Sequence, residues 1–528
     1  MKIAIAQLNY TVGDIDGNAS KIIDSINKAK AQHADLVIFA EQAVSGTPAF
    51  DLLRKTTFLE LCEDALVEIA SCCDGIAAIV GLPILTDKGT VSAAALIQDR
   101  KVLRYVGKKY ISARREMGFL VPSKGYEYAT IKGHKCAIIV GDDLSREHDF
   151  DKSVETIISI NARRYGKGTM IYRYEMMHNL AFVEGKNLVM VNQVGGSTEI
   201  VYDGTSGALN KHGVPVLMMK NFEEDFQIFD TEVAETMPPV VIPSTYNDRN
   251  RLVYEAARCG LRDFFRKNNY EKAAIGLSGG IDSAVVACLA VDALGAKNVR
   301  ALLMPSQFSS NASVEDAKTL ARNLGIEYNV IPISEIYTSV VNTLKPAIGV
   351  TEFDSTEENI QTRIRTVLLM ALQNKTGYVL LNSSNKSENA LGLCTLYGDT
   401  AGAFSPTGDL YKSEMYDVAR YINRRFGDVI PDSILNKEPS SELHPGQKDS
   451  DILPPYEVVD AILFRMIEEG QHREEIVNAG FDSAVVEKIH SMIMHNEKKR
   501  FQFPPVLRLS SCSFGHERLM PLTNKYGD

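Results

Sequence analysis

The sequence has neither an excess of positive charge nor a long apolar run. Its 57 Lys and Arg residues are outnumbered by 67 Asp and Glu residues, which gives a formal net charge of −10 at pH 7. Proteins that coat DNA or RNA are normally basic, so this balance argues against nucleic acid as a partner. No stretch approaches the roughly 18 apolar residues of a membrane span, and the first residues, MKIAIAQLNY, lack the apolar region of a signal peptide. We therefore expect a cytoplasmic protein with no membrane partner.

The eight cysteines lack the spacing of a disulfide framework or a zinc site. They are scattered along the chain without a CxxC pair, at Cys62, Cys72, Cys73, Cys136, Cys259, Cys288, Cys394 and Cys512. Metal-binding and redox cysteines usually come in such close pairs. We interpret these residues as buried side chains that act as small hydrophobes.

The chain has 528 residues, 45 % of them hydrophobic, which is enough for two large α/β domains. In residues 1–235, short runs such as KIAIAQ, DLVIFA and KCAIIVG alternate with helical stretches, which favours a layered α/β sandwich. Residues 236–250 contain three prolines and predict a linker. Residues 251–528 open with an amphipathic helix over Leu252–Lys267 and then alternate strands with helices, which predicts a doubly wound parallel sheet.

The first strand of that sheet, AAIGL, runs into a turn rich in glycine and serine just before a helix. The glycines let backbone amides turn inward, Ser278 and Ser283 add hydroxyl donors, and the helix N-terminus adds the positive end of its dipole. No lysine follows the glycines, so the turn is not a Walker loop, and the spacing of its glycines does not match GxGxxG. Phosphate would repel Asp282 unless a divalent cation bridged them, so Asp282 is a predicted magnesium ligand.

The run SGGIDS after a buried strand resembles the SGGxDS signature of the PP-loop ATP pyrophosphatases, which adenylate a substrate and release pyrophosphate. Residues 304–326, 356–377, 382–421 and 520–524 extend this resemblance to NAD+ synthetase over about residues 250–525. The resemblance implies that ATP adenylates the nicotinate carboxylate of deamido-NAD+ and that ammonia displaces AMP, with Mg2+ bound. It also implies a homo-oligomer, at least a dimer formed through the synthetase domains.

The resemblance also assigns site residues where the motifs match. It places ATP on Gly276, Leu277, Ser278, Gly279, Gly280, Ile281, Asp282, Ser283, Ser383 and Lys412. It places deamido-NAD+ on Asn359, Glu388, Asp399 and Lys499, and magnesium on Asp282 and Glu388. Ser383 stands where the family usually has threonine, and it keeps the hydroxyl. Lys412 has a physical reason as well, because pyrophosphate leaves with several negative charges that a cation stabilises.

The first half resembles the nitrilase-like, carbon–nitrogen hydrolase fold, an αββα sandwich that serves as the glutaminase of glutamine-dependent NAD+ synthetases. That family uses a glutamate base, a lysine that stabilises the oxyanion and a cysteine nucleophile. Glu41 in LVIFAEQAVSG and Lys108 in VGKKYISARREM match the first two. The run over residues 187–209, NLVMVNQVGGSTEIVYDGTSGAL, matches the family as well.

The cysteine nucleophile is missing from its expected place. The family has cysteine in a run ICEDIW at a strand end, whereas this chain has IVGDDLS, with Gly141 at the nucleophile position. Glycine has no side chain, so no acyl-enzyme can form there. Cys136 lies five residues earlier in the same strand, and this odd spacing points it to the opposite face. We therefore do not expect Cys136 to replace the nucleophile.

A second departure lies in the segment by which the family contacts glutamine. The family has NASP, and here Arg163 and Arg164 replace the Ser-Pro pair. We expect the two cations to fill or recharge the amide pocket, and we predict an ammonia-using NAD+ synthetase with a degenerate glutaminase domain. The alternatives are an active glutamine-hydrolysing NAD+ synthetase, a PP-loop amide ligase for another carboxylate, and a non-catalytic nucleotide-binding scaffold.

Overall fold

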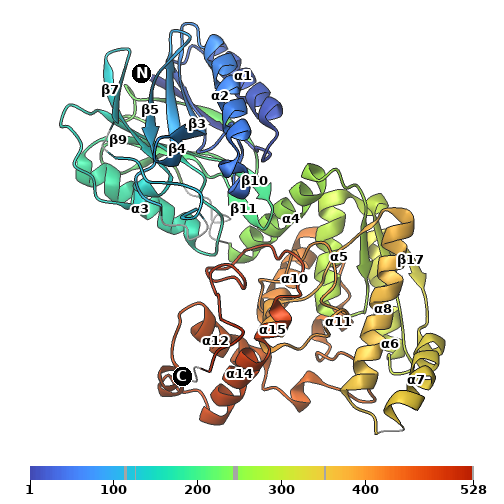
Figure 1. Ribbon diagram of the computed structural model, residues 1–528. Coiled ribbons are helices and arrows are strands. Elements are labelled where there is room, and N and C mark those ends of the chain that lie inside the picture. Colours follow the sequence, from blue (N-terminus) through green and yellow to red (C-terminus); the bar gives the residue numbers. More distant parts are fainter. Residues whose placement is uncertain (112–115, 125–126, 242–247, 350–351, 526–528) are drawn as a thin grey trace. The chain divides into compact units, whose positions relative to one another are not determined.

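The computed structural model describes residues 1–111, 116–124, 127–241, 248–349 and 352–525. The chain divides into two compact units, residues 1–244 and 245–528 (Figure 1). This division falls within the predicted linker 236–250, of which residues 242–247 lie outside the described residues. Among the described helices, none is long and apolar enough to cross a membrane.

Two six-stranded sheets form the first unit. The first sheet has the strand order β14-β1-β2-β3-β4-β5, with β14 (Asp225–Asp230), β1 (Lys2–Gln7), β2 (Leu36–Ile38), β3 (Ala77–Thr86), β4 (Gly89–Gln98) and β5 (Lys101–Gly107). The second has the order β13-β12-β9-β8-β7-β6, with β13 (Pro215–Met218), β12 (Gly207–Leu209), β9 (Asn187–Asn192), β8 (Thr156–Asn161), β7 (His134–Val140) and β6 (Glu127–Ile131). A separate pair consists of β10 (Val194–Ser197) and β11 (Ile200–Asp203).

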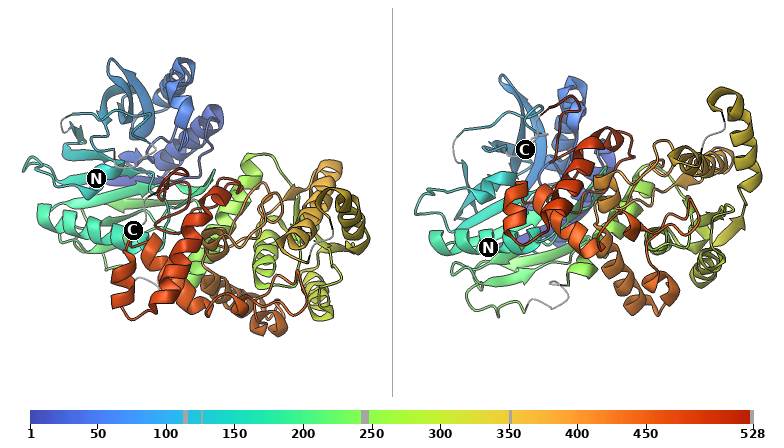
Figure 2. Two further views of the ribbon diagram at one scale, coloured as in Figure 1. Left: turned by 60° about the horizontal axis from the view of Figure 1, so that its bottom comes forward. Right: turned by 90° about the horizontal axis from the view of Figure 1, so that it is seen from below.

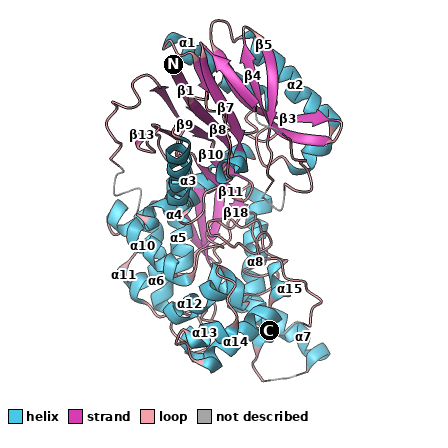
Figure 3. Ribbon diagram, turned by 90° about the vertical axis from the view of Figure 1, so that its left-hand side faces the viewer, coloured by secondary structure: helices cyan, strands magenta, loops and turns pink. Residues whose placement is uncertain are grey.

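The two sheets stack face to face and helices cover their outer faces (Figure 3). In β1, Ile3 and Ile5 enter the core between the sheets, whereas Ala4 and Ala6 face the helices, as the twofold alternation of a strand requires. The outer layers are α1 (Ile15–Ala31) and α2 (Thr56–Ser71) on the first sheet and α3 (Thr169–Glu184) on the second. The predicted αββα sandwich is therefore confirmed.

The second unit contains a four-stranded parallel sheet with the order β17-β16-β15-β18. Its strands are β15 (Ala273–Gly276), β16 (Val299–Leu303), β17 (Glu327–Val330) and β18 (Val379–Leu380). The chain steps from β15 outward to β17 and then returns to the other side of β15 as β18, so the order reverses between β15 and β18. A crevice at the carboxyl ends of such a pair is the usual ligand site of a doubly wound sheet, and this sheet confirms the predicted fold.

The helices of the second unit fall into two groups. Those around the sheet are α4 (Arg249–Lys267), α5 (Ile281–Leu294), α6 (Asn311–Leu324), α7 (Ser334–Ile348), α8 (Ser355–Thr376), α9 (Lys386–Leu391), α10 (Lys412–Phe426) and α11 (Asp432–Asn436). The C-terminal group is α12 (Tyr456–Ile467), α13 (Arg473–Asn478), α14 (Ser483–His495) and α15 (Glu497–Arg500). The C-terminal helices pack with α9 around a core of their own, away from α7 and α8 (Figures 1 and 2).

Two details differ from the sequence-based expectations. Helix α4 begins at Arg249, three residues before the predicted start, because the Asp248 side chain accepts hydrogen bonds from the amides of Asn250 and Arg251. All eight cysteines are free, and five are buried as expected. Cys72, Cys394 and Cys512 are only half-buried, because the first ends α2 and the other two lie in loops.

Candidate functional site

The first cluster of predicted site residues lies where three strands of the sandwich end. Glu41 follows β2, Lys108 follows β5 and Gly141 follows β7. The Glu41 and Lys108 side chains are buried, and the Lys108 Nζ lies 3.2 Å from the Glu41 Oε1. The Ser92 hydroxyl donates to the same carboxylate oxygen at 2.8 Å. The fold therefore brings both predicted members of the triad together.

Gly141 lies directly against this pair. A Cβ atom at position 141 would be 2.4 Å from the Glu41 Oε2 and 3.0 Å from the Lys108 Cε. The backbone at Gly141 has φ +59°, in the left-handed region that favours glycine. The position that the sequence comparison assigned to the nucleophile thus faces Glu41 and Lys108, and it carries no reactive atom.

Two further carboxylates, which the sequence reasoning missed, surround Lys108. The Lys108 Nζ lies 2.9 Å from the Glu116 Oε2 and 3.5 Å from the Asp142 Oδ2. Burial alone would lower the pKa of Lys108, but its three carboxylate neighbours raise that pKa above the ordinary value. Burial, together with Glu41 and Asp142, raises the pKa of Glu116 to about 7. The lysine is therefore held as a cation within an acidic cluster.

Arg163, Arg164 and Cys136 lie differently with respect to the Glu41–Lys108 cluster. The half-buried Arg163 extends toward the cluster, with its Nη2 3.9 Å from the Asp142 Oδ1. The Arg164 Nη1 instead donates to the Tyr165 carbonyl at 3.4 Å. Cys136 is fully buried in the core between the two sheets, and burial raises the pKa of its thiol to about 12. Such a thiol stays protonated at neutral pH, which agrees with the expectation that Cys136 is no nucleophile.

Replacing Gly141 by alanine is expected to destabilise the first unit. The left-handed backbone costs alanine about 1–2 kcal/mol, and crowding of the paired Glu41 side chain adds about 1–3 kcal/mol. Gly185 offers a matched control because its φ is +63° and a Cβ there meets no atom within 4 Å. Chemical denaturation should show a larger loss for Gly141→Ala than for Gly185→Ala. Equal losses would mean that position 141 is not crowded.

The second cluster begins at the predicted phosphate loop, residues 276–283, between β15 and α5. The Ser278 hydroxyl accepts from the Gly280 amide at 3.2 Å and lies 3.1 Å from the Ser283 hydroxyl. Gly279 has φ +80°, and a Cβ there would lie 2.2 Å from the Ser313 carbonyl oxygen at the start of α6. The loop therefore needs glycine at 279 to wind closely over two helix N-termini, which is the geometry of an anion cradle.

Three charged side chains meet beside this loop. The Lys412 Nζ lies 2.5 Å from the Asp282 Oδ2 and 3.2 Å from the Glu388 Oε1. The Asn385 side chain joins the two acids, since its Nδ2 donates to Asp282 at 3.0 Å and its Oδ1 accepts from the Glu388 amide at 2.9 Å. Burial, together with the Asp282 carboxylate, raises the pKa of Glu388 to about 8. The cluster thus places one buried cation between two carboxylates at the edge of the phosphate loop.

The residues predicted to bind the dinucleotide gather around Thr395. The Asn359 Oδ1 on α8 accepts from the Thr395 hydroxyl at 2.6 Å. The Asp399 Oδ1 accepts from the Thr395 amide at 2.7 Å. The fold therefore unites a helix and a loop that are 36 residues apart in sequence.

Lys499 and Ser383 complete the predicted set. The Lys499 Nζ donates to the carbonyls of Gly392 and Cys394, at 2.6 and 2.9 Å, at the end of α9. Ser383 is half-buried and follows β18, so it lies at the same carboxyl edge of the sheet as the phosphate loop. The binding roles of all these residues remain predictions.

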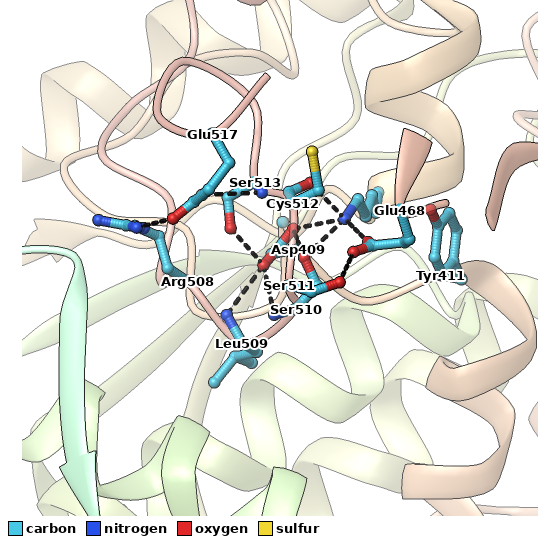
Figure 4. A network of polar contacts seen from close by, with 12 residues as sticks. Asp409, Tyr411, Glu468, Arg508, Leu509, Ser510, Ser511, Cys512, Ser513 and Glu517 are labelled. Carbon is cyan, nitrogen blue, oxygen red and sulfur yellow. Dashed lines mark hydrogen bonds and ion pairs between the residues drawn. The ribbon is translucent and has the colours of Figure 1, made fainter. Parts of the chain in front are cut away.

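A polar network beside the second cluster fixes the C-terminal residues (Figure 4). Asp409 is buried and accepts hydrogen bonds from the amides of Leu509 and Ser510 at 2.8 and 2.7 Å. The hydroxyls of Ser510 and Ser513 donate to it at 2.9 and 2.7 Å. One carboxylate thus holds the segment from Leu509 to Ser513 against the turn that leads into α10.

Lys386, at the first position of α9, neutralises this network. Its side chain is fully buried, its Nζ lies 3.0 Å from the Asp409 Oδ1, and it also pairs with Glu468, the residue that follows α12. Lys386 is two residues from Glu388, and Asp409 is three residues from Lys412. The ion pairs therefore fix the backbone on both sides of the Asp282 cluster.

Replacing Lys386 by methionine is expected to lower the free energy of unfolding of the second unit by about 3–5 kcal/mol, because two buried carboxylates would lose their cation. Lys448→Met is the matched control, since Lys448 is exposed and pairs with the exposed Glu438 at 2.7 Å. This control should change little, because exposed pairs contribute little to stability. Similar denaturation midpoints for both variants would contradict the role assigned to Lys386.

Comparison with known proteins places the chain in a family. The NAD synthase family model matches residues 253–503. Glutamine-dependent NAD(+) synthetases of Aquifex aeolicus and Acinetobacter baylyi are 38% and 35% identical, over 100% and 99% of this chain and 100% and 98% of their own lengths.

Solved structures agree over the whole chain. The glutamine-dependent NAD+ synthetase from Acinetobacter baumannii, in complex with adenosine diphosphate, has 34% identity and a TM-score of 0.78, covering 99% of this chain and 98% of that one. The enzyme from Cytophaga hutchinsonii, at 19% identity and a TM-score of 0.85, shares the fold over 99% of this chain and 98% of its own. With full-length relatives this similar, the chain belongs to the glutamine-dependent NAD(+) synthetase family.

Proposed function

We propose that this protein is an NAD+ synthetase that amidates deamido-NAD+ with ammonia at the expense of ATP. The observation that carries the proposal is the buried Asp282–Lys412–Glu388 cluster beside the SGGxDS loop of a chain from this family. The ADP bound to the Acinetobacter baumannii relative supports ATP as the nucleotide. Cytoplasmic location and a homo-oligomer remain part of the proposal.

The reaction needs no covalent intermediate on the protein. A carboxylate oxygen of the nicotinate ring attacks the α-phosphorus of ATP, and the bond to the leaving pyrophosphate breaks. Ammonia then attacks the acyl-adenylate, loses a proton, and AMP leaves with the carboxylate oxygen. The protein contributes alignment and stabilisation of charge. In this proposal the amides and hydroxyls of the phosphate loop and the Lys412 ammonium would stabilise the charge that develops on the leaving pyrophosphate.

The same cluster fits a magnesium ion. Magnesium in phosphoryl-transfer sites is typically held by one or two carboxylates together with substrate phosphates. Asp282 and Glu388 supply two carboxylates, which share the Lys412 ammonium. In the described part of the chain, no group of three or more His, Cys, Asp or Glu side chains is suited to a metal. These two residues would hold Mg2+, which would neutralise phosphate charge when bound.

The proposal also names free ammonia, and not glutamine, as the nitrogen source. Gly141 supports free ammonia, because no side chain at that position can attack glutamine next to Glu41 and Lys108. The relatives are named glutamine-dependent, which favours the alternative of an active glutaminase in this chain. We retain that alternative as the second candidate function.

The ligase activity can be tested by identifying the reaction products. Purified protein with deamido-NAD+, ATP, magnesium chloride and ammonium chloride should form NAD+, AMP and pyrophosphate in equal amounts. Formation of ADP and phosphate, or amidation only of a different carboxylate in a substrate panel, would contradict the proposal.

A further inference from the structure

Arg365 on α8 is a cation at the phosphate loop that the sequence assignments do not include. Its Nε donates to the carbonyl of Met304 at 3.0 Å, directly after β16. A Cβ at Gly276 would lie 3.6 Å from Met304 Cε and 3.3 Å from Leu369 Cδ1. Leu369 lies one helical turn after Arg365, on the same face of α8. Met304, which accepts from Arg365, and Leu369 both lie against Gly276, the first residue of the phosphate loop. Arg365 therefore lies close to the start of that loop.

A second set of neighbours places Arg365 in the same region. The acidic groups that favour its charged form are Asp399 and Glu442. Glu442 accepts from the Ser313 hydroxyl at 2.6 Å, and the Ser313 carbonyl is the atom against which Gly279 packs. Arg365 is thus near the first turn of α6, which borders the phosphate loop, and near the loop that carries Asp399.

The charge of Arg365 is poorly compensated within the protein. The residue is half-buried, and within the residues the structure describes its one hydrogen bond is the Nε contact to Met304. Two other arginines of this unit have carboxylate partners, Arg258 with Glu255 and Arg500 with Glu497. Burial lowers the pKa of Arg365 to about 10, which agrees with the lack of a carboxylate bonded to its guanidinium. A partly desolvated cation with unpaired Nη groups is suited to an anionic ligand.

We propose that Arg365 binds phosphate oxygens of ATP over the loop of residues 276–283 and remains bound to the leaving pyrophosphate. The inference rests on the proposed function for the reaction, although binding itself requires no turnover. Lys412 is already shared by two carboxylates, so Arg365 adds a cation whose Nη groups are not committed to an acid. A planar guanidinium can also bind two oxygens at once, which suits a polyphosphate. The pyrophosphate of deamido-NAD+ has the same chemistry, so the test separates the two sources.

The test measures binding by calorimetry in the presence of magnesium, with ATP, inorganic pyrophosphate and deamido-NAD+ as separate probes. Arg365→Gln should weaken the binding of ATP and of pyrophosphate by about 10- to 100-fold and leave deamido-NAD+ binding unchanged. Arg365→Lys keeps the positive charge but lacks the planar pair of N–H donors, so it should lose less affinity for ATP and pyrophosphate. Lys375→Gln removes an exposed cation from the same helix and should change none of the three affinities.

Steady-state kinetics adds a readout that a purely structural role would not move. Arg365→Gln should raise the KM for ATP and weaken product inhibition by pyrophosphate, while the KM for deamido-NAD+ stays the same. A loss of affinity confined to deamido-NAD+ would assign the guanidinium to the dinucleotide and overturn the proposal. Unchanged ATP binding by Arg365→Gln would also overturn it. So would an Arg365→Lys protein whose affinities for all three ligands fall equally.

The two proposals fail separately. If the wild-type protein binds ATP but forms no NAD+, the proposed function is wrong, while the binding arm still decides the role of Arg365. If the wild-type protein does not bind ATP, both proposals are wrong. Should Arg365→Gln fail to fold, Arg365→Lys decides the question through the ratio of its losses for ATP and deamido-NAD+.

Discussion

Replacing Lys412 by methionine is expected to lower kcat for NAD+ formation by about 10³-fold, a size typical of losing a charge that stabilises the transition state. The Lys412 ammonium lies beside Asp282 and Glu388 at the phosphate loop, where the proposed reaction would develop negative charge on the leaving pyrophosphate. Burial alone would lower the pKa of Lys412, but the two acids raise it well above its usual range, so the side chain is charged at neutral pH. The measurement is steady-state turnover with ammonium at saturating ATP and deamido-NAD+.

Two controls accompany the Lys412 variant. Lys318→Met removes a cation from α6 that pairs with the exposed Glu315 at 2.7 Å, and it should leave kcat unchanged. Lys412→Arg keeps the buried charge and should fold normally while still losing rate, because the longer planar group cannot occupy the same place. A Lys412→Met enzyme that folds and keeps more than about a tenth of the wild-type kcat would contradict the role of this lysine in charge stabilisation.

Replacing Gly279 by alanine is expected to abolish measurable ATP binding. The backbone there has φ +80°, and the new Cβ would lie 2.2 Å from the Ser313 carbonyl oxygen, a backbone atom that cannot rotate away. Relief of the contact requires that the loop or α6 move, and either movement displaces the amides that would hold the phosphates. Calorimetric titration with ATP and magnesium measures the effect directly.

Gly280 provides the matched comparison in the same loop. Its φ of −97° is accessible to alanine, and a Cβ there meets only the Ser278 hydroxyl, at 3.3 Å. Gly280→Ala should therefore weaken ATP binding by less than about tenfold, since only a cap residue changes. Equal losses for the two variants would mean that the tight approach at Gly279 is not what shapes the site.

The sequence predicted the features that depend on local pattern. Alternation of apolar residues in runs such as KIAIAQ predicted the strands, because successive side chains must face opposite layers. The loop at residues 276–283 was predictable because its glycines, serines and following helix are contiguous. The start of α4 was missed, because the cap formed by Asp248 lies in a segment that looked like linker.

Contacts between distant residues could not be predicted in this way. Lys386 and Glu468 are 82 residues apart, and nothing in either local sequence indicates a buried ion pair. Glu116 resembles an ordinary charged loop residue until the fold places it on Lys108. The sequence analysis gave Arg365 no role, and nothing around it in the helix indicates the contact of its Nε with the Met304 carbonyl after β16. Such roles depend on which elements the tertiary fold brings together.

The most direct test of the proposed ammonia-dependent activity compares two nitrogen sources in one assay. Purified protein receives ATP, magnesium and deamido-NAD+, with either ammonium chloride or ammonia-free glutamine, and NAD+ is followed by a coupled absorbance change. We predict turnover with ammonium and, because Gly141 offers no nucleophile, no more than about a hundredth of that rate with glutamine. Glu41→Gln should leave the ammonium rate unchanged. Comparable rates with glutamine that Glu41→Gln abolishes would contradict the loss of the glutaminase and establish that it is active.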